Sequence, residues 1–214
     1  MTDRYANFAD LRRHESENHD FAVFYREVDS DVAILAPHGG GIEPGTVDIA
    51  DALAGCDYTF YGFKGMKPSG NAVLHISSHR FDEPLGLKAA QNARVVVTIH
   101  GSRDTTEMVH VGGRDEVLKA RLVDALGAAG FTAVISKVPG LCGIHPENLC
   151  NRGRSGKGVQ LEISRGLRER LFKDLDHRSL RSKTTGFYRF VRALRAGLTP
   201  ISGDGGCREL RTED

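Results

Sequence analysis

The chain alternates short runs of β-branched and apolar residues with longer segments whose apolar residues recur at helical spacing. This alternation is typical of an α/β domain: a mixed, largely parallel open sheet with helices on both faces. Strands are expected over 21–25, 32–36, 58–63, 72–76, 94–99, 132–135 and 159–163, and helices over 3–15, 46–53, 83–91, 114–129 and 184–198. No linker-like stretch divides the 214 residues. We therefore expect one domain over 1–198 and a flexible tail over 199–214.

Composition narrows the class of protein. A formal net charge of +1 gives no general argument for binding nucleic acid or a membrane surface. No secretory signal is visible at the start of the sequence, and no apolar run approaches the roughly 18 residues of a membrane span. Four cysteines are too few for a disulfide scaffold. The sequence favours a cytoplasmic protein with reduced cysteines, although Cys142 and Cys150 flank a short loop and could be oxidised together.

Two of the expected strands end in histidine followed by glycine. His38 follows the run 32–36 and precedes three glycines, and His100 follows the run 94–99. Ligands of open α/β sheets collect at the carboxyl ends of strands. The glycines allow the chain to fold back so that Glu43 meets His38, and two imidazoles with a carboxylate form the donor set of many hydrolytic zinc sites. The alternatives are a simple strand-to-helix turn, with Glu43 complementing the helix dipole, and a hydrogen-bonded core histidine.

Glu162 is the most informative carboxylate. Apolar Val159, Leu161 and Ile163 alternate with polar residues, so Glu162 lies on the polar face of a strand. At a sheet edge this face would meet water. In a central strand Glu162 would be a costly buried carboxylate with a functional role, such as the general base beside a zinc-activated water.

The loop before that strand is rich in glycine and cations. Arg152 or Arg154 could bind a substrate carboxylate through two hydrogen bonds. Asn151 and Gly158 break the Walker pattern, which excludes a phosphate-binding P-loop. A solvated turn remains the alternative for Lys157 and for at least one of the two arginines. Arg165, Arg168 and Arg170 lie on the helix after the Glu162 strand, where the sequence favours a solvated face over contact with nucleic acid. Cys142, His145 and Cys150 lack the second pair that a structural zinc site needs. A polar cluster that includes His75 and His79 either lines the same site or lies on a surface loop without a functional role.

Three blocks together resemble the phage-type poly-γ-glutamate hydrolase family, some members of which are labelled phage-related replication proteins. The blocks are Pro37 to Thr46, His79 to Pro84, and Asn151 to Ser164. The resemblance covers roughly residues 5–197 and implies a core similar to zinc carboxypeptidases. It also implies one zinc ion held by His38, Glu43 and His100, with Glu162 as the catalytic glutamate. By a looser likeness, Asn151 and Arg152 match residues that grip a substrate carboxylate in carboxypeptidases.

The sequence thus predicts a zinc-dependent amidohydrolase acting on γ-glutamyl or related anionic amide bonds. Arg154, Lys157 and His79 complete the predicted substrate-binding residues. One alternative is a zinc deacylase or carboxypeptidase that acts on small N-acyl amino acids or cell-wall peptides. A second alternative is a non-enzymatic replication accessory protein that binds nucleic acid, which the charge balance disfavours. The protein is expected to be a monomer or small homo-oligomer without membrane partners, released by lysis if it is phage-derived.

Overall fold

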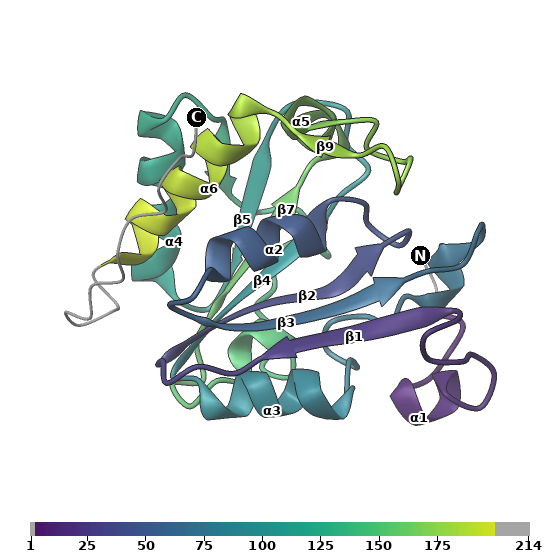
Figure 1. The fold of residues 1–214 in the computed structure, drawn as a ribbon. Helices are drawn as coiled ribbons and strands as arrows, with labels where there is room; N and C mark the ends of the chain where they lie inside the picture. The colour runs from purple at the N-terminus through teal and green to yellow at the C-terminus, as the bar shows by residue number, and fades with distance from the viewer. Residues whose placement is uncertain (1–2, 200–214) are drawn as a thin grey trace.

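The computed structural model describes residues 3–199, which build a seven-stranded sheet (Figure 1). The strand order is β1-β3-β2-β4-β7-β5-β6, and β1 lies at one edge. Strands β3, β2, β4 and β7 are mutually parallel, while β1 and β5 run antiparallel to their neighbours β3 and β7. The strands are β1 (Phe21–Arg26), β2 (Val32–Gly40), β3 (Thr59–Gly65), β4 (Val95–Gly101), β5 (Val109–Gly113), β6 (Ala133–Ile135) and β7 (Val159–Ile163). The predicted mixed, largely parallel sheet is confirmed.

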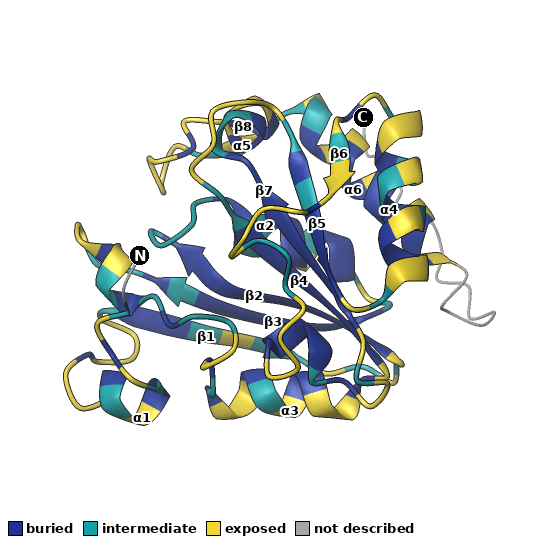
Figure 2. Cartoon of the chain, turned by 180° about the vertical axis from the view of Figure 1, so that it is seen from behind, coloured by how far each residue is buried: buried dark blue, intermediate teal, exposed yellow. Residues whose placement is uncertain are grey.

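Helices cover both faces of the sheet and bury two separate cores. On one face lie α2 (Thr46–Ala54), α4 (Glu116–Ala128) and α6 (Thr185–Leu198), which with the short α5 (Arg165–Leu171) bury the larger core. On the other face lie α1 (Phe8–Leu11), α3 (Pro84–Asn92) and the 3₁₀ turns η1 (Asn71–Leu74) and η2 (Leu149–Asn151) (Figure 1). A separate hairpin joins β8 (Phe172–Lys173) to β9 (Ser182–Lys183). Figure 2 shows that the central strands are buried almost throughout.

The second face of the sheet becomes polar at the carboxyl end of β4 and along β7. Val159, Leu161 and Ile163 of β7 all pack into the larger core, so the residues between them point to the second face. Those residues are Gln160 and Glu162, both of which are buried. By the same alternation, His100 of β4 and His110 of β5 point to this second face. The sheet itself therefore brings a row of polar side chains together.

Some elements differ from the sequence-based expectation. Residues 72–76 form the 3₁₀ turn η1 and an extended exit instead of a strand, and the helix expected over 3–15 is limited to Phe8–Leu11. Strand β5 was not predicted. The proposed flexible tail lies, apart from its first residue, outside the described residues. No helix within residues 3–199 is both long and apolar enough to cross a membrane.

Candidate metal centre and active site

A bulge in β2 turns His38 toward the second face of the sheet. Ile34 and Ala36 pack into the larger core, so simple alternation would place His38 in that core as well. The pairing of β2 with β3 shifts between Ala36 and Gly39, which is the expected effect of a bulge carrying Pro37. His38 consequently lies against Phe81 and the carbonyl of Ile76, which belong to the second core.

The glycines after His38 are required by close packing. A Cβ at Gly39 would lie 2.0 Å from Cγ2 of Val47, and one at Gly40 would lie 2.3 Å from the carbonyl oxygen of Gly65. Gly40 also has a φ of +67°, in the left-handed region that favours glycine. The chain then folds back so that the Glu43 amide donates to the His38 carbonyl at 2.8 Å. This turn brings the Glu43 carboxylate next to the His38 ring.

His38, Glu43 and His100 converge at the carboxyl ends of β2 and β4. The two Nδ1 atoms of His38 and His100 are 3.1 Å apart, and both rings are buried. Glu43 places Oε1 3.4 Å from Nδ1 of His38 and Oε2 3.9 Å from Nδ1 of His100. The amide of Gly101 donates to Glu43 Oε2 at 2.7 Å, which fixes the carboxylate across the two strand ends.

The donor atoms fit a tetrahedral zinc ion. Ligand atoms about 2.0–2.1 Å from one zinc lie about 3.3–3.4 Å apart in a tetrahedron. The 3.1 Å between the two Nδ1 atoms and the 3.4 Å from His38 Nδ1 to Glu43 Oε1 are close to this edge, and the 3.9 Å from His100 Nδ1 is measured to the other oxygen, Oε2. Nε2 of His38 lies 2.7 Å from the carbonyl oxygen of Ile76, so it carries the proton and leaves the Nδ1 lone pair facing Glu43 and His100.

Burial and charge set the protonation of the cluster. Burial opposes protonation of His38, but the Glu43 carboxylate outweighs it and raises the His38 pKa. Burial, reinforced by the charge of His38, lowers the pKa of His100 to about 3, so this ring stays neutral. The pKa of Glu43 is lowered because the nearby histidines outweigh the opposing effect of burial. A neutral imidazole and an ionised carboxylate are the forms that bind zinc.

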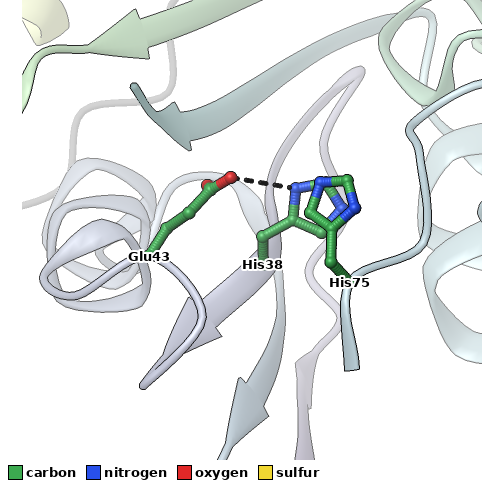
Figure 3. A group of neighbouring side chains, drawn as sticks. All are labelled: His38, Glu43 and His75. Carbon is green, nitrogen blue, oxygen red and sulfur yellow. Dashed lines mark ion pairs between the residues drawn. The ribbon is translucent and has the colours of Figure 1, made fainter. Parts of the chain in front are cut away.

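His75 joins the same cluster from the turn after η1. Its ring centroid lies 4.1 Å from that of His38, and ligand atoms of His38, Glu43 and His75 all lie within 4.8 Å of one another. Figure 3 shows the His75 ring beside the His38 ring, with Glu43 facing both. Nδ1 of His75 lies 2.9 Å from Oδ1 of Asp3, a residue whose side chain is buried. Asp3 was not predicted, because nothing in a polar N-terminal segment marks one aspartate as buried.

Glu162 lies next to the cluster on a central strand, as the functional interpretation of the sequence required. It pairs in register with His100 on one side and with His110 on the other. The side-chain amide nitrogen of Gln160 donates to Glu162 Oε1 at 2.9 Å, and the side-chain oxygen of Gln160 accepts a hydrogen bond from Asn148. Burial, followed by repulsion from Glu43, raises the pKa of Glu162 to about 8. Such a carboxyl group exchanges a proton near neutral pH.

Arg152 contacts the segment that carries Ser78, whose hydroxyl lies 3.4 Å from Nε2 of His100, while the side chain of Asn151 makes hydrogen bonds within its own loop. The Arg152 guanidinium donates to the carbonyl oxygens of Glu147, His79 and Phe81, and it lies 3.4 Å from the exposed Glu147 carboxylate. The amide nitrogen of Asn151 donates to the carbonyl oxygens of Gly143 and His145. Both side-chain N–H donors of Asn151 are thus used within the loop, and its contact with substrate stays a prediction. The predicted residue His79 is exposed and stacks near His145.

Arg154 and Lys157 do not reach the site. The Arg154 amide bonds to the Ala93 carbonyl at the amino end of β4, and its guanidinium pairs with Asp31. Lys157 is exposed just before the amino end of β7, whereas Glu162 lies at the carboxyl end. Strands β4 and β7 therefore separate this basic loop from the cluster of His38, Glu43 and His100, which weighs against the predicted substrate-binding role of both residues. Within the described residues the thiols of Cys142 and Cys150 are free, and Cys207 lies outside them.

Arg168 is a second residue whose role the sequence did not reveal. It was assigned to a solvated helix face, but it is buried. Its guanidinium donates to the carbonyl oxygens of Ile163, Pro44 and Ser102. Ile163 is the last residue of β7, and Pro44 and Ser102 follow β2 and β4, so one side chain links the carboxyl ends of three strands.

Comparison with known proteins identifies the family of this chain. The family model for poly-gamma-glutamate hydrolase matches residues 5–193. The chain belongs to the poly-gamma-glutamate hydrolase family. A solved structure of a bacteriophage poly-gamma-glutamate hydrolase superposes with a TM-score of 0.89 at 30% identity, covering 93% of this chain and 98% of that one. The sequence resemblance is thereby confirmed, and this family member is a hydrolase.

Relatives of this hydrolase also occur in Bacillus subtilis (strain 168). Protein YndL is 39% identical over 195 residues, which cover 90% of this chain and 76% of YndL. A solved structure of YndL in a zinc-free form has a TM-score of 0.85 at 38% identity and covers 92% of this chain and 98% of that one. An N-formylglutamate amidohydrolase from Ralstonia eutropha, with a TM-score of 0.52 and 12% identity over 85% of this chain and 97% of that one, shares the fold alone.

Proposed function

We propose that this hydrolase is a zinc-dependent amidohydrolase that cleaves γ-glutamyl bonds of poly-γ-glutamate or a similar anionic polyamide. The observation that carries the proposal is the convergence of His38, Glu43 and His100, with spacings that fit zinc, next to the buried Glu162. Family membership and the zinc-free form of YndL support the substrate class and the metal.

Glu162 acts as the proton carrier of the reaction. Zinc, when bound, polarises the scissile carbonyl and acidifies water. Glu162 accepts a proton from the attacking water and passes it to the departing nitrogen, so that the amide bond breaks without releasing a strongly basic amine anion. Gln160 donates to Oε1 and leaves Oε2 for the proton. The position of Glu162 beside His100, together with its raised pKa, supports this role as proton carrier.

Arg152 binds a carboxylate of the substrate. Its contacts to the His79 and Phe81 carbonyls are long, at 3.1 and 3.4 Å, and the Glu147 carboxylate lies 3.4 Å away. Glu147 is largely exposed, so an incoming carboxylate can displace it at little cost. A guanidinium then holds the substrate through paired hydrogen bonds.

The first test is metal content and polymer cleavage by the same preparation. Purified protein should contain close to one zinc per chain, and it should shorten poly-γ-glutamate and release new amino groups. Removal of zinc by a chelator should abolish cleavage, and added Zn²⁺ should restore it. A panel of N-acyl glutamates and cell-wall peptides distinguishes this activity from a small-substrate deacylase. Zinc-independent cleavage, or zinc binding with no cleavage of any polyglutamate, would contradict the proposal.

The second test isolates Glu162. Glu162→Gln should retain zinc and lower kcat by about three orders of magnitude or more, as expected when a general base is removed. His38→Ala should lose both zinc and activity. Near-normal turnover by Glu162→Gln would remove Glu162 from the mechanism while leaving the metal site intact.

A further inference from the structure

Asp3, at the start of the described chain, contacts His75 beside the cluster. The side chain of Asp3 is 2% exposed, although it lies in a segment without regular structure. Oδ2 accepts hydrogen bonds from the amide of Ser77 at 2.9 Å and from its hydroxyl at 2.6 Å. Oδ1 is left for Nδ1 of His75, at 2.9 Å. A carboxylate buried in this way keeps the Asp3–His75 pair in one geometry.

This geometry fixes the His75 tautomer. Because Asp3 is the acceptor at Nδ1, the proton of the neutral ring is on Nδ1 and the lone pair is on Nε2. Metal-binding histidines commonly donate their other ring N–H to a carboxylate or a carbonyl. His38 does so with the Ile76 carbonyl, and His75 does so with Asp3. His100 has only a 3.4 Å contact with the Ser78 hydroxyl at its Nε2.

We propose that Nε2 of His75 is an additional ligand of the ion held by His38, Glu43 and His100, and that Asp3 positions it. The inference rests on the proposed zinc site. A ring nitrogen of His75 and ligand atoms of His38 and Glu43 all lie within 4.8 Å of one another, a spacing from which one metal ion can draw the three side chains together. Zinc in catalytic sites can accept a fifth ligand, so the additional histidine leaves room for substrate. The N-terminal segment is then part of the metal centre.

The test measures metal binding directly. Zn²⁺ affinity is determined by competition with a chelating dye, and Co²⁺ substituted for zinc reports the ligand set through its visible absorption. His75→Ala should weaken Zn²⁺ binding at least tenfold and change the Co²⁺ spectrum. Asp3→Asn should weaken it about 10- to 100-fold, as is typical for residues that orient a ligand. His75→Gln, which keeps a polar side chain, repeats the test if the alanine variant does not fold.

A double variant separates positioning from general stabilisation. If Asp3 acts through His75, the Asp3→Asn, His75→Ala double variant binds Zn²⁺ as well as His75→Ala alone. Ser77→Ala removes one hydrogen bond to Asp3 without touching His75 and should leave the Co²⁺ spectrum unchanged. His19→Ala and Asp29→Asn, both at exposed residues, serve as controls.

The outcomes distinguish this inference from the proposed function. Wild-type affinity and an unchanged Co²⁺ spectrum in His75→Ala, with zinc lost in His38→Ala, would overturn the role of His75 and leave the zinc hydrolase intact. Additive losses in the double variant would overturn the positioning role of Asp3. A wild-type protein that binds no Zn²⁺ would overturn the proposed function itself.

Discussion

Burial changes the ionisation of individual residues at this site, and this change affects the stability of the fold. Glu162 is the clearest case. Its folded-state pKa of about 8 lies above the ordinary value of 4.5. Between pH 4.5 and about pH 8 the folded, metal-free protein binds more protons than the unfolded chain. The free energy of unfolding therefore falls as the pH rises through this range, because Glu162 ionises at a lower pH in the unfolded chain. The uncharged form is the one that folding favours.

Glu162→Gln should therefore stabilise the metal-free protein increasingly from pH 5 to pH 9. The difference in melting temperature between the variant and the wild type should be small at pH 5 and largest at pH 9. Thermal unfolding of chelator-treated protein measures it, with Glu169→Gln, an exposed acid of α5, as the control. A difference that does not depend on pH would show that Glu162 is ionised, or paired, in the folded protein.

Two glycines with similar backbone angles should respond differently to alanine. Gly40 and Gly70 have φ values of +67° and +72°. A Cβ at Gly70 meets nothing within 4 Å, whereas one at Gly40 meets backbone atoms of Gly65. Gly70→Ala should cost about 1–2 kcal/mol of stability from backbone strain alone. Gly40→Ala should cost clearly more and weaken zinc binding, because His38 must move. Denaturant unfolding and zinc titration test this, and equal costs would contradict the packing argument.

At the scale of elements, α5 holds the loops of the site through Arg168. Arg168→Met should lower the free energy of unfolding by about 3 kcal/mol, because one buried and two partly buried carbonyl oxygens each lose a hydrogen bond from a charged donor. Zinc affinity should fall as well, since Pro44 follows Glu43 directly and Ser102 follows the His100–Gly101 pair. Arg168→Lys should recover part of the loss, because one ammonium cannot reach all three carbonyls.

The control for Arg168 is its partly exposed neighbour Arg165. Arg165 pairs with Glu169 and Asp176 on the surface of α5. Arg165→Lys should change stability by no more than about 0.5 kcal/mol. A loss in Arg165→Lys equal to that in Arg168→Met would assign the effect to α5 as a whole instead of to the loop contacts.

The elements also show which features a sequence can predict. Strands β2, β4 and β7 follow from their apolar runs, and the histidines at the ends of two of them follow from chain direction. The run 72–76 satisfies strand alternation equally well, but packing of Leu74 and Ile76 into the second core makes it a turn. Strand β5 was missed because Val109–Gly113 is short and ends in two glycines. Its alternation of valine with His110 was the available signal.

Contacts between distant segments could not be predicted. Asp3 meets His75 across 72 positions, and Arg168 meets the Pro44 carbonyl across 124. Polar residues in a loop or on a short helix carry no local pattern that distinguishes burial from exposure. The predicted ligands required only that two strands be neighbours, whereas these supporting residues depend on how loops pack above the sheet. The sequence therefore predicts the candidate metal ligands better than the residues that hold these ligands in place.

For the whole molecule, the direction of the parallel strands predicts which cations contact substrate. The metal cluster lies at the carboxyl ends of β2 and β4, whereas Arg154 and Lys157 lie at amino ends of the sheet. The double variant Arg154→Ala, Lys157→Ala should therefore keep the KM and kcat of the wild type for poly-γ-glutamate. Arg152→Ala should raise KM at least tenfold, because the loop beside the cluster loses its guanidinium. Arg152→Lys should recover only part of this loss, since an ammonium does not form paired hydrogen bonds.

Steady-state kinetics at low and moderate salt would measure both effects. An increase in KM for the double variant as large as that for Arg152→Ala would show that the polymer wraps around the sheet, and that charge at both ends contributes to binding.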